Sequence, residues 1–185
     1  MASLSLDDTA QPRHKAPTKP KVSRVLYFEH LVDDPDGVIA LALSALGLVI
    51  NRADRTIVSL GDRVYVANSK FHVTVLFLRG SDGQMQAATL TKRLGAKVSI
   101  RVTEIGVNDQ FICFGVEKIE CDDDEIPYYG NDVMHITFAM ADPIDGGEKP
   151  QAKNSHLALN PMTGSVIRLA NPVTFLATFG AHMSS

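Results

Sequence analysis

The stretches KFHVTVLFL (residues 70–78) and VMHITFAMA (residues 133–141) share one pattern, a His-x-Thr tripeptide inside an apolar run. Both runs are rich in β-branched and aromatic residues, which is typical of strands. Side chains alternate between the faces of a strand, so each imidazole shares a face with the hydroxyl two residues on, and Ala139 joins that face in the second run. We expect the opposite, buried faces to consist of Phe71, Val73, Val75 and Phe77, and of Met134, Ile136, Phe138 and Met140.

The two polar faces carry the main candidate residues, His72, Thr74, His135 and Thr137. An imidazole exchanges protons near neutral pH because its ordinary pKa is about 6.5. A hydroxyl can donate a hydrogen bond to an anionic oxygen. If both faces line one cleft, that cleft has the groups needed to open a phosphodiester without a metal. For either tripeptide alone, the alternative is a surface pair on a half-exposed strand, where Thr is favoured for its shape.

The paired motifs resemble the two H-x-[ST]-hydrophobic signatures of the 2H phosphoesterase superfamily, whose members carry one in each of two internally related lobes. Within it, the chain is most similar to the cyclic phosphodiesterase domain of plant- and fungal-type tRNA ligases. Two further features support this similarity: Val25–Glu29 leads into an Asp-capped helix, and the Ala-Lys-Asn-Ser sequence at 152–155 opens another helix. The resemblance covers residues 24–180.

The resemblance implies a fold and a reaction. The fold would be α+β and two-lobed, with antiparallel sheets and outer helices around a central cleft. The reaction would convert a 2′,3′-cyclic phosphate, at an RNA end or in a nucleotide, to a 2′-phosphate. His72 and His135 would serve as general base and acid, in an order that the sequence leaves open, while Thr74 and Thr137 would bind the phosphate. No metal or other cofactor is expected.

Other candidate residues have two interpretations each. Tyr128 and Tyr129 precede the second motif and either stack on a base or cover the core. Lys153, at a helix start, either contacts phosphate or is solvated. The acidic run at 122–125 lacks the spacing of an EF-hand, and we interpret it as a solvated loop rather than a metal site. Three histidines outside the motifs are interpreted as ordinary surface or partly buried residues: His30, His156 and His182.

Length and composition set further bounds. The chain has 185 residues, 45% of them hydrophobic, which is enough for one domain with a proper core, expected at 23–182. Two cysteines form no disulfide framework, so we expect a reducing compartment, cytoplasmic or nuclear, and Cys113 is interpreted as a small core residue. No apolar run approaches the length of a membrane span, so no membrane partner is expected.

Charge and composition separate the N-terminus from the rest. Residues 1–22 are polar, Pro-rich and basic, and we interpret them as a disordered tail that is solvated or touches an RNA backbone. Residues 25–185 hold 13 basic and 19 acidic groups. A net negative body argues against a broad duplex-binding surface, but not against binding of one terminal phosphate.

The order of the expected elements indicates an α+β fold with mainly antiparallel connections, in two sheets or one split sheet. A helix is expected to start at Asp34-Pro35 and stop at Gly47, and a second to run from Asp82 to Leu94. The remaining expectations are a strand at 24–30, a hairpin of 56–60 with 64–67, strands at 97–107 and 110–119, a short helix at 150–159, and a closing hairpin of 165–170 with 173–179.

Three alternatives to the proposed activity stay open. One is a phosphodiesterase for 2′–5′-linked oligoadenylate or another small nucleotide that uses the same two histidines. Another is a non-catalytic module that grips a terminal phosphate at an RNA end, and the third is an interaction domain whose His-x-Thr pairs have no role. The expected partner is RNA with a 2′,3′-cyclic phosphate end or a cyclic nucleotide. We expect a monomer, or a part of a larger ligase.

Overall fold

The computed structural model describes residues 25–52, 57–78, 80–121, 126–130, 132–142 and 149–183. The basic tail at 1–22, the acidic run at 122–125 and most of the loop at 142–150 lie outside them. In chain order the elements are β1 (Val25–Val32), α1 (Pro35–Leu46), β2 (Val49–Arg52), β3 (Ile57–Leu60), β4 (Arg63–Ala67), β5 (His72–Phe77), α2 (Gly80–Thr91), β6 (Lys97–Val107), β7 (Phe111–Cys121), β8 (His135–Ala141), the 3-10 helix η2 (Ala152–Leu159) and β9 (Ser165–Met183).

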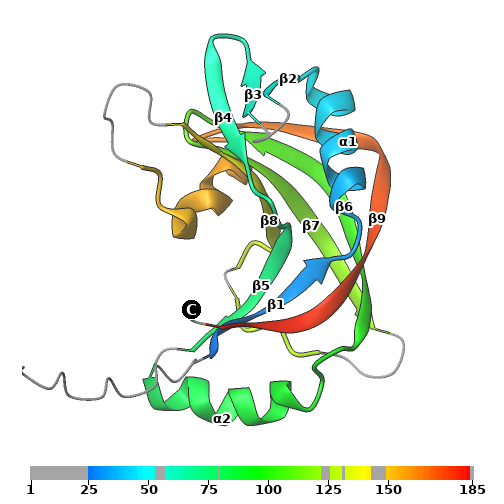
Figure 1. Ribbon diagram of the computed structural model, residues 1–185, viewed down its shortest axis with the longest axis vertical. Coiled ribbons are helices and arrows are strands. Elements are labelled where there is room, and N and C mark those ends of the chain that lie inside the picture. Colours follow the sequence, from blue (N-terminus) through cyan, green and yellow to red (C-terminus); the bar gives the residue numbers. More distant parts are fainter. Residues whose placement is uncertain are drawn as a thin grey trace, which may run out of the picture.

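The nine strands form one antiparallel sheet in the order β2-β3-β4-β8-β7-β6-β9-β1-β5. The sheet curls strongly (Figure 1), so that the terminal strand β5 returns to lie beside β8. Two backbone hydrogen bonds tie the segments that precede these strands to the opposite strand: Asn68 N, before β5, donates to the Phe138 carbonyl of β8 (2.9 Å), and Tyr129 N, before β8, donates to the Val75 carbonyl of β5 (3.0 Å). The predicted α+β class with antiparallel pairing is therefore confirmed, whereas the two-lobed arrangement stays a prediction.

Local signals located several elements well. The α1 helix has the expected Asp34 N-cap, whose carboxylate accepts from the Gly37 amide at 2.9 Å, and it ends at Gly47 in the left-handed region. The hairpin of β3 and β4 is also present. The second helix, however, begins at Gly80 rather than at Asp82 and gives way to turns after Thr91.

The predicted closing hairpin is wrong, because β9 is one long bent strand. Residues 165–178 of β9 pair with β6, on both sides of a break in register. At that break Val102 pairs with Val173 and Glu104 pairs with Arg168, so residues 169–172 of β9 bulge from the ladder. Asn171-Pro172 has the sequence of a turn, but proline is also tolerated at a bulge, where no ladder hydrogen bond is needed. The strand β2 was not predicted.

A β-bulge directly follows the Thr in both motif strands. Consecutive residues of β1 pair with residues two apart on β5, and the extra residue is Val75, next to Thr74. Consecutive residues of β7 likewise pair with residues two apart on β8, and the extra residue is Phe138, next to Thr137. Since a bulge sets two residues against one, it shifts the alternation of every side chain beyond it.

These bulges correct the predicted faces. Phe77 is 46% exposed, and Leu76 is buried where strict alternation placed Phe77. In β8, Ala139 is fully buried in the main core, and Met140 takes the polar face where Ala139 was expected. Of the other six side chains predicted to be buried, Met134 is partly buried, and five are fully or almost fully buried, namely Phe71, Val73, Val75, Ile136 and Phe138.

The core lies inside the curled sheet, and α1 packs against it through Val38 and Ala42. Helix α2 lies at the opposite end of the molecule from α1 (Figure 1). Cys113 is fully buried beneath η2, where burial raises the pKa of its thiol to about 12, as suits the predicted core role. In the part of the chain that the structure describes, no helix combines the length and the apolar character needed to cross a membrane.

The 3-10 helix η2 approaches the backbone of β6 closely at Gly106. A Cβ atom at this position would collide with the carbonyl group of Ala158 and the amide of Leu159, both of them backbone. Backbone cannot turn aside as a flexible side chain can, so the absence of a side chain at Gly106 sets the distance between η2 and the sheet.

We therefore expect Gly106→Ala to displace η2 and to lower the free energy of unfolding by about 1–3 kcal/mol, the usual cost of overpacking. Urea unfolding of both proteins would measure this. The control is Gly180→Ala in β9, where an added Cβ meets nothing within 4 Å; its effect should stay within about 0.5 kcal/mol. Equal stabilities for the two variants would contradict the close approach.

Candidate active site

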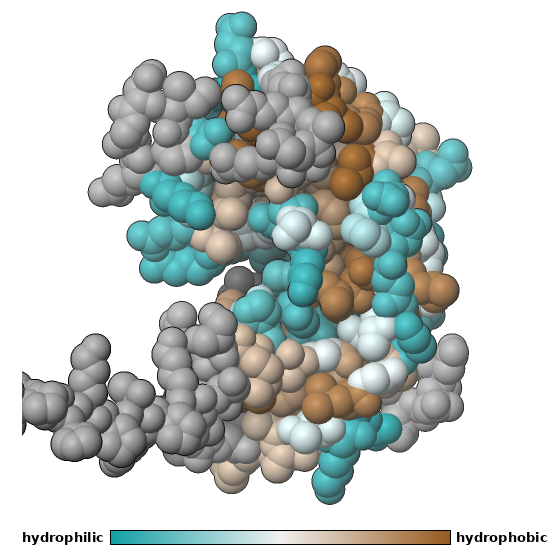
Figure 2. All heavy atoms as spheres, in the orientation of Figure 1, coloured by the Kyte–Doolittle hydropathy of each residue, from teal (hydrophilic) through white to brown (hydrophobic). Residues whose placement is uncertain are grey.

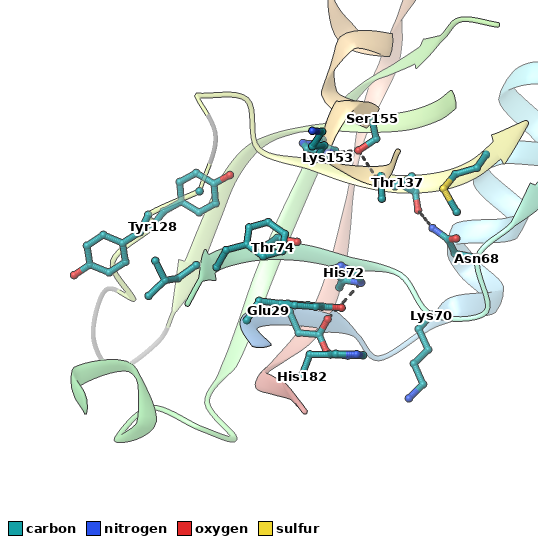
Figure 3. Close-up of a pocket in the computed structure, with 18 of the residues that line it drawn as sticks. Glu29, Asn68, Lys70, His72, Thr74, Tyr128, Thr137, Lys153, Ser155 and His182 are labelled. Carbon is teal, nitrogen blue, oxygen red and sulfur yellow. Dashed lines mark hydrogen bonds and ion pairs between the residues drawn. The ribbon is translucent and has the colours of Figure 1, made fainter. Parts of the chain in front are cut away.

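One pocket of about 550 Å³ lies where β5 returns to β8. In Figure 3, Thr137 of β8 with Lys153 and Ser155 of η2 lies on one side, and β5 with Glu29 and His182 lies on the other. Figure 2 shows the molecule indented between these two parts, with hydrophilic residues along the indentation. All seven residues predicted from the sequence line this pocket: His72, Thr74, Tyr128, Tyr129, His135, Thr137 and Lys153.

The ring of His135 is held at both nitrogens. Its Nδ1 lies 2.9 Å from the Val133 carbonyl oxygen, and its Nε2 lies 2.9 Å from Ser155 Oγ. A carbonyl oxygen only accepts, so Nδ1 must carry a proton. In the neutral ring, Nε2 then carries the lone pair, and it accepts a hydrogen bond from the Ser155 hydroxyl.

Ser155 joins His135 to Thr137. The Thr137 hydroxyl donates to Ser155 Oγ at 2.8 Å, which leaves the serine proton for His135. Ser155 is only 1% exposed, and its backbone carbonyl accepts from the Cys113 thiol at 3.1 Å. The sequence singled out Ser155 only as part of a helix start, because nothing in the local pattern indicates which helix residue meets a strand 18 positions away.

The ring of His72 has different neighbours. Its Nδ1 lies 3.4 Å from Glu29 Oε2, and its face stacks on the Tyr27 ring with centroids 5.6 Å apart. Glu29 also lies 3.9 Å from His182 Nδ1. Sequence reasoning assigned no role to Glu29 or His182, and it interpreted the latter as ordinary. The positions of Glu29 and His182 in their strands do not indicate that their side chains lie close together.

Burial lowers the pKa of both motif imidazoles. For His72 the pKa falls to about 4, and the positive charges of His182 and His135 act in the same direction. For His135 burial dominates and His156 adds to it, while the hydrogen bond to Val133 works against them. Both rings are therefore neutral at pH 7 in the free protein, and each carries one lone pair and one N–H, which in His135 are already bonded to Ser155 and Val133.

Cations and aromatic rings complete the lining. Lys70, which the sequence did not single out, and Lys153 are exposed at the pocket and supply positive charge. Tyr129 is 39% exposed, and Tyr128 is partly buried, which raises the pKa of its phenol. The structure thus brings both tyrosines to the pocket wall, and their contact with a base stays a prediction.

The lining combines groups that can exchange protons with groups that can hold an anion. A neutral imidazole can accept a proton and a protonated imidazole can donate one, and hydroxyls with ammonium groups can hold a small anion between them. Among the residues that the structure describes, no three His, Cys, Asp or Glu side chains gather as a metal-binding group.

We expect NMR titration of the histidine ring signals to show His72 unprotonated until the pH approaches about 4. The unfolded chain binds this proton near pH 6.5, so the free energy of unfolding should fall as the pH decreases from about 6.5 toward 4. A midpoint for His72 near its ordinary value would contradict the burial of this ring.

Comparison with known proteins identifies a fold and no family. No protein-family profile matches the chain, and no curated protein matches it. A solved structure described as a fungal RNA kinase matches 90% of this chain, with a TM-score of 0.52 and 17% sequence identity. The match covers 47% of that structure's chain, so this chain spans about half the length of the protein it resembles. The likeness establishes a shared fold.

Proposed function

We propose that the protein hydrolyses a 2′,3′-cyclic phosphate to a 2′-phosphate, with His72 and His135 as the general acid–base pair. One observation carries this proposal: the two His-x-Thr tripeptides, 63 positions apart, line the same pocket. A chance pair of surface tripeptides would have no reason to converge. The bulge after each Thr adds a second repeated feature.

The reaction needs two proton transfers. One imidazole takes a proton from water as the water oxygen bonds to phosphorus. The bond from phosphorus to the 3′ oxygen breaks, and the other imidazole, which must be protonated when the substrate is bound, delivers its Nε2 proton to that oxygen. The negative charge of a bound phosphate favours this protonated form. The base ends the reaction protonated and the acid ends it neutral, so one proton exchange of each ring with solvent restores the starting state.

The anion-binding groups suit the charge that develops. The transition state places negative charge on the non-bridging oxygens of phosphorus, where hydroxyl donors and cations stabilise it. Four residues that line the pocket can supply these donors and charges: Thr74, Thr137, Lys70 and Lys153. Ser155 holds the Thr137 hydroxyl in the free protein, so the substrate would have to compete for that donor.

An RNA end is the substrate that we favour over a free nucleotide. The fold is shared with a structure described as a fungal RNA kinase, a protein that modifies RNA. The pocket is open to solvent, and exposed Tyr129 offers a ring on which an unpaired base can stack. A neighbouring nucleotide would therefore have a surface to rest on.

Activity on a 2′,3′-cyclic phosphate should survive EDTA, because side chains fill every role proposed here. Chromatography of products from a cyclic nucleotide and from a cyclic-phosphate-ended RNA would measure this, with a 2′-phosphate and a free 3′-hydroxyl as the expected ends. Loss of turnover in chelator, with recovery on adding a divalent ion, would rule the metal-independent mechanism out.

His72→Ala and His135→Ala should each lower kcat on the order of 10²-fold or more, since a positioned acid or base contributes about that much. The control is Glu120→Ala on β7, an exposed side chain that does not line the pocket. We expect near-normal turnover for it. A motif variant that keeps near-normal turnover, with an unchanged melting temperature, would remove that histidine from the mechanism.

A further inference from the structure

The carboxylate of Glu29 is buried at the pocket and faces two imidazoles. Glu29 is 8% exposed, its Oε2 lies 3.4 Å from His72 Nδ1, and its Oε1 lies 3.9 Å from His182 Nδ1. Carboxylates are rarely buried unless they are paired, because removal from water disfavours the charged form. The acid–base mechanism above makes no use of this group.

Sheet order explains how three strands meet here. Strand β1 lies between β9 and β5, and Glu29 pairs with Gly180 on one side and Thr74 on the other. One neighbouring strand therefore supplies His182 and the other supplies His72. Figure 3 shows both imidazoles beside the Glu29 carboxylate.

Tyr27 holds the two imidazoles in place from the same strand. It precedes Glu29 by two residues and lines the same pocket. Its ring stacks on His182 with centroids 4.5 Å apart and planes 5° apart, and on His72 at 5.6 Å and 29°. Each ring is thus fixed by an aromatic face and lies near a carboxylate oxygen.

We propose that Glu29 is a positioning residue for His72: it holds the Nδ1 proton toward its carboxylate, leaves Nε2 as the lone pair at the pocket, and couples His72 to the charge of His182. The expected effect of Glu29 on the reaction rate rests on the proposed function, whereas its expected effect on the tautomer and the charge of His72 does not. His135 has a neutral backbone carbonyl in the equivalent position, so the two motif histidines differ in the charge behind them.

Four groups face the Glu29 carboxylate, and their signs fix the expected shifts. Burial raises the pKa of Glu29, and the positive charges of His182 and Lys70 act against it by lowering that pKa. Tyr27 and His72 also lie beside the carboxylate, and both are neutral at neutral pH. Loss of the carboxylate removes a negative charge that favours protonated His72, so the pKa of His72 should fall further. Loss of His182 removes a positive charge, so the pKa of His72 should rise.

The test is NMR of the full chain with 15N-labelled histidine, which reports both tautomer and titration without any substrate. In the wild type, the His72 signals should show the proton on Nδ1 at pH 7. Glu29→Gln should move the His72 midpoint to lower pH and mix the tautomers, while His182→Gln should move the midpoint to higher pH. The control is Glu120→Gln, which removes an exposed carboxylate paired with Lys118 and should move neither.

Opposite shifts from the two variants support the coupling, because a purely structural defect would not reverse sign. An unchanged tautomer and midpoint in Glu29→Gln would overturn the proposal. If Glu29→Gln does not fold, His182→Gln remains a test, because the side chain of His182 is 47% exposed and its replacement should leave the fold intact. An unmoved His72 midpoint in His182→Gln would overturn the coupling.

Kinetics separates this inference from the proposed function. If the wild type cleaves a 2′,3′-cyclic nucleotide, Glu29→Gln should lower kcat/KM about tenfold or more, since an orienting carboxylate fixes the catalytic tautomer, and the limb of the pH profile that belongs to His72 should move to lower pH. A wild type without turnover but with the two NMR shifts would overturn the phosphodiesterase proposal and leave the role of Glu29 intact. If Glu29→Gln leaves both the turnover and the pH profile unchanged, the role of Glu29 as a positioning residue is overturned.

Discussion

The meeting of β5 with β8 is the constraint on which the candidate site depends. These strands are not hydrogen-bonded neighbours in the sheet, but β5 follows β4 after residues 68–71, and β4 pairs with β8. The amide of Asn68, which precedes β5, bonds to the Phe138 carbonyl of β8, and the amide of Tyr129, which precedes β8, bonds to the Val75 carbonyl of β5. Buried backbone groups need such partners, so these bonds tie the segment before each motif strand to the other motif strand.

The repeated bulge shapes what the pocket contains. In a regular strand the fifth residue after each motif His would point into the core. The bulge after Thr74 and after Thr137 turns that residue outward instead, so that Phe77 and Met140 line the pocket beside the polar groups. Each motif strand thus gives the site an imidazole, a hydroxyl and large apolar side chains, which are Leu76 and Phe77 in β5 and Met140 in β8. Under the proposed function, polar groups beside apolar walls suit a ligand that has a phosphate and a less polar body.

Both motif strands carry a His-x-Thr tripeptide, yet their two histidines lie in different electrostatic environments. His135 is fixed by a backbone carbonyl and by Ser155, both neutral. His72 lies beside a carboxylate and, through it, near a second imidazole that is half exposed to solvent. A protonated ring would be stabilised differently at the two positions. The electrostatic contrast between equal motifs therefore comes from neighbours that the motifs do not specify.

Relations between residues close in the chain were predictable from the sequence. The cap at Asp34, the turn at Gly47 and the shared face of each His-x-Thr follow from backbone geometry over a few residues. The convergence of the motifs, the bulges, the unbroken β9 and the roles of Ser155 and Glu29 depend on which strands become neighbours. That choice is settled by burial and hydrogen bonding summed over the whole sheet, so no local pattern encodes it, and only the tertiary structure decides it.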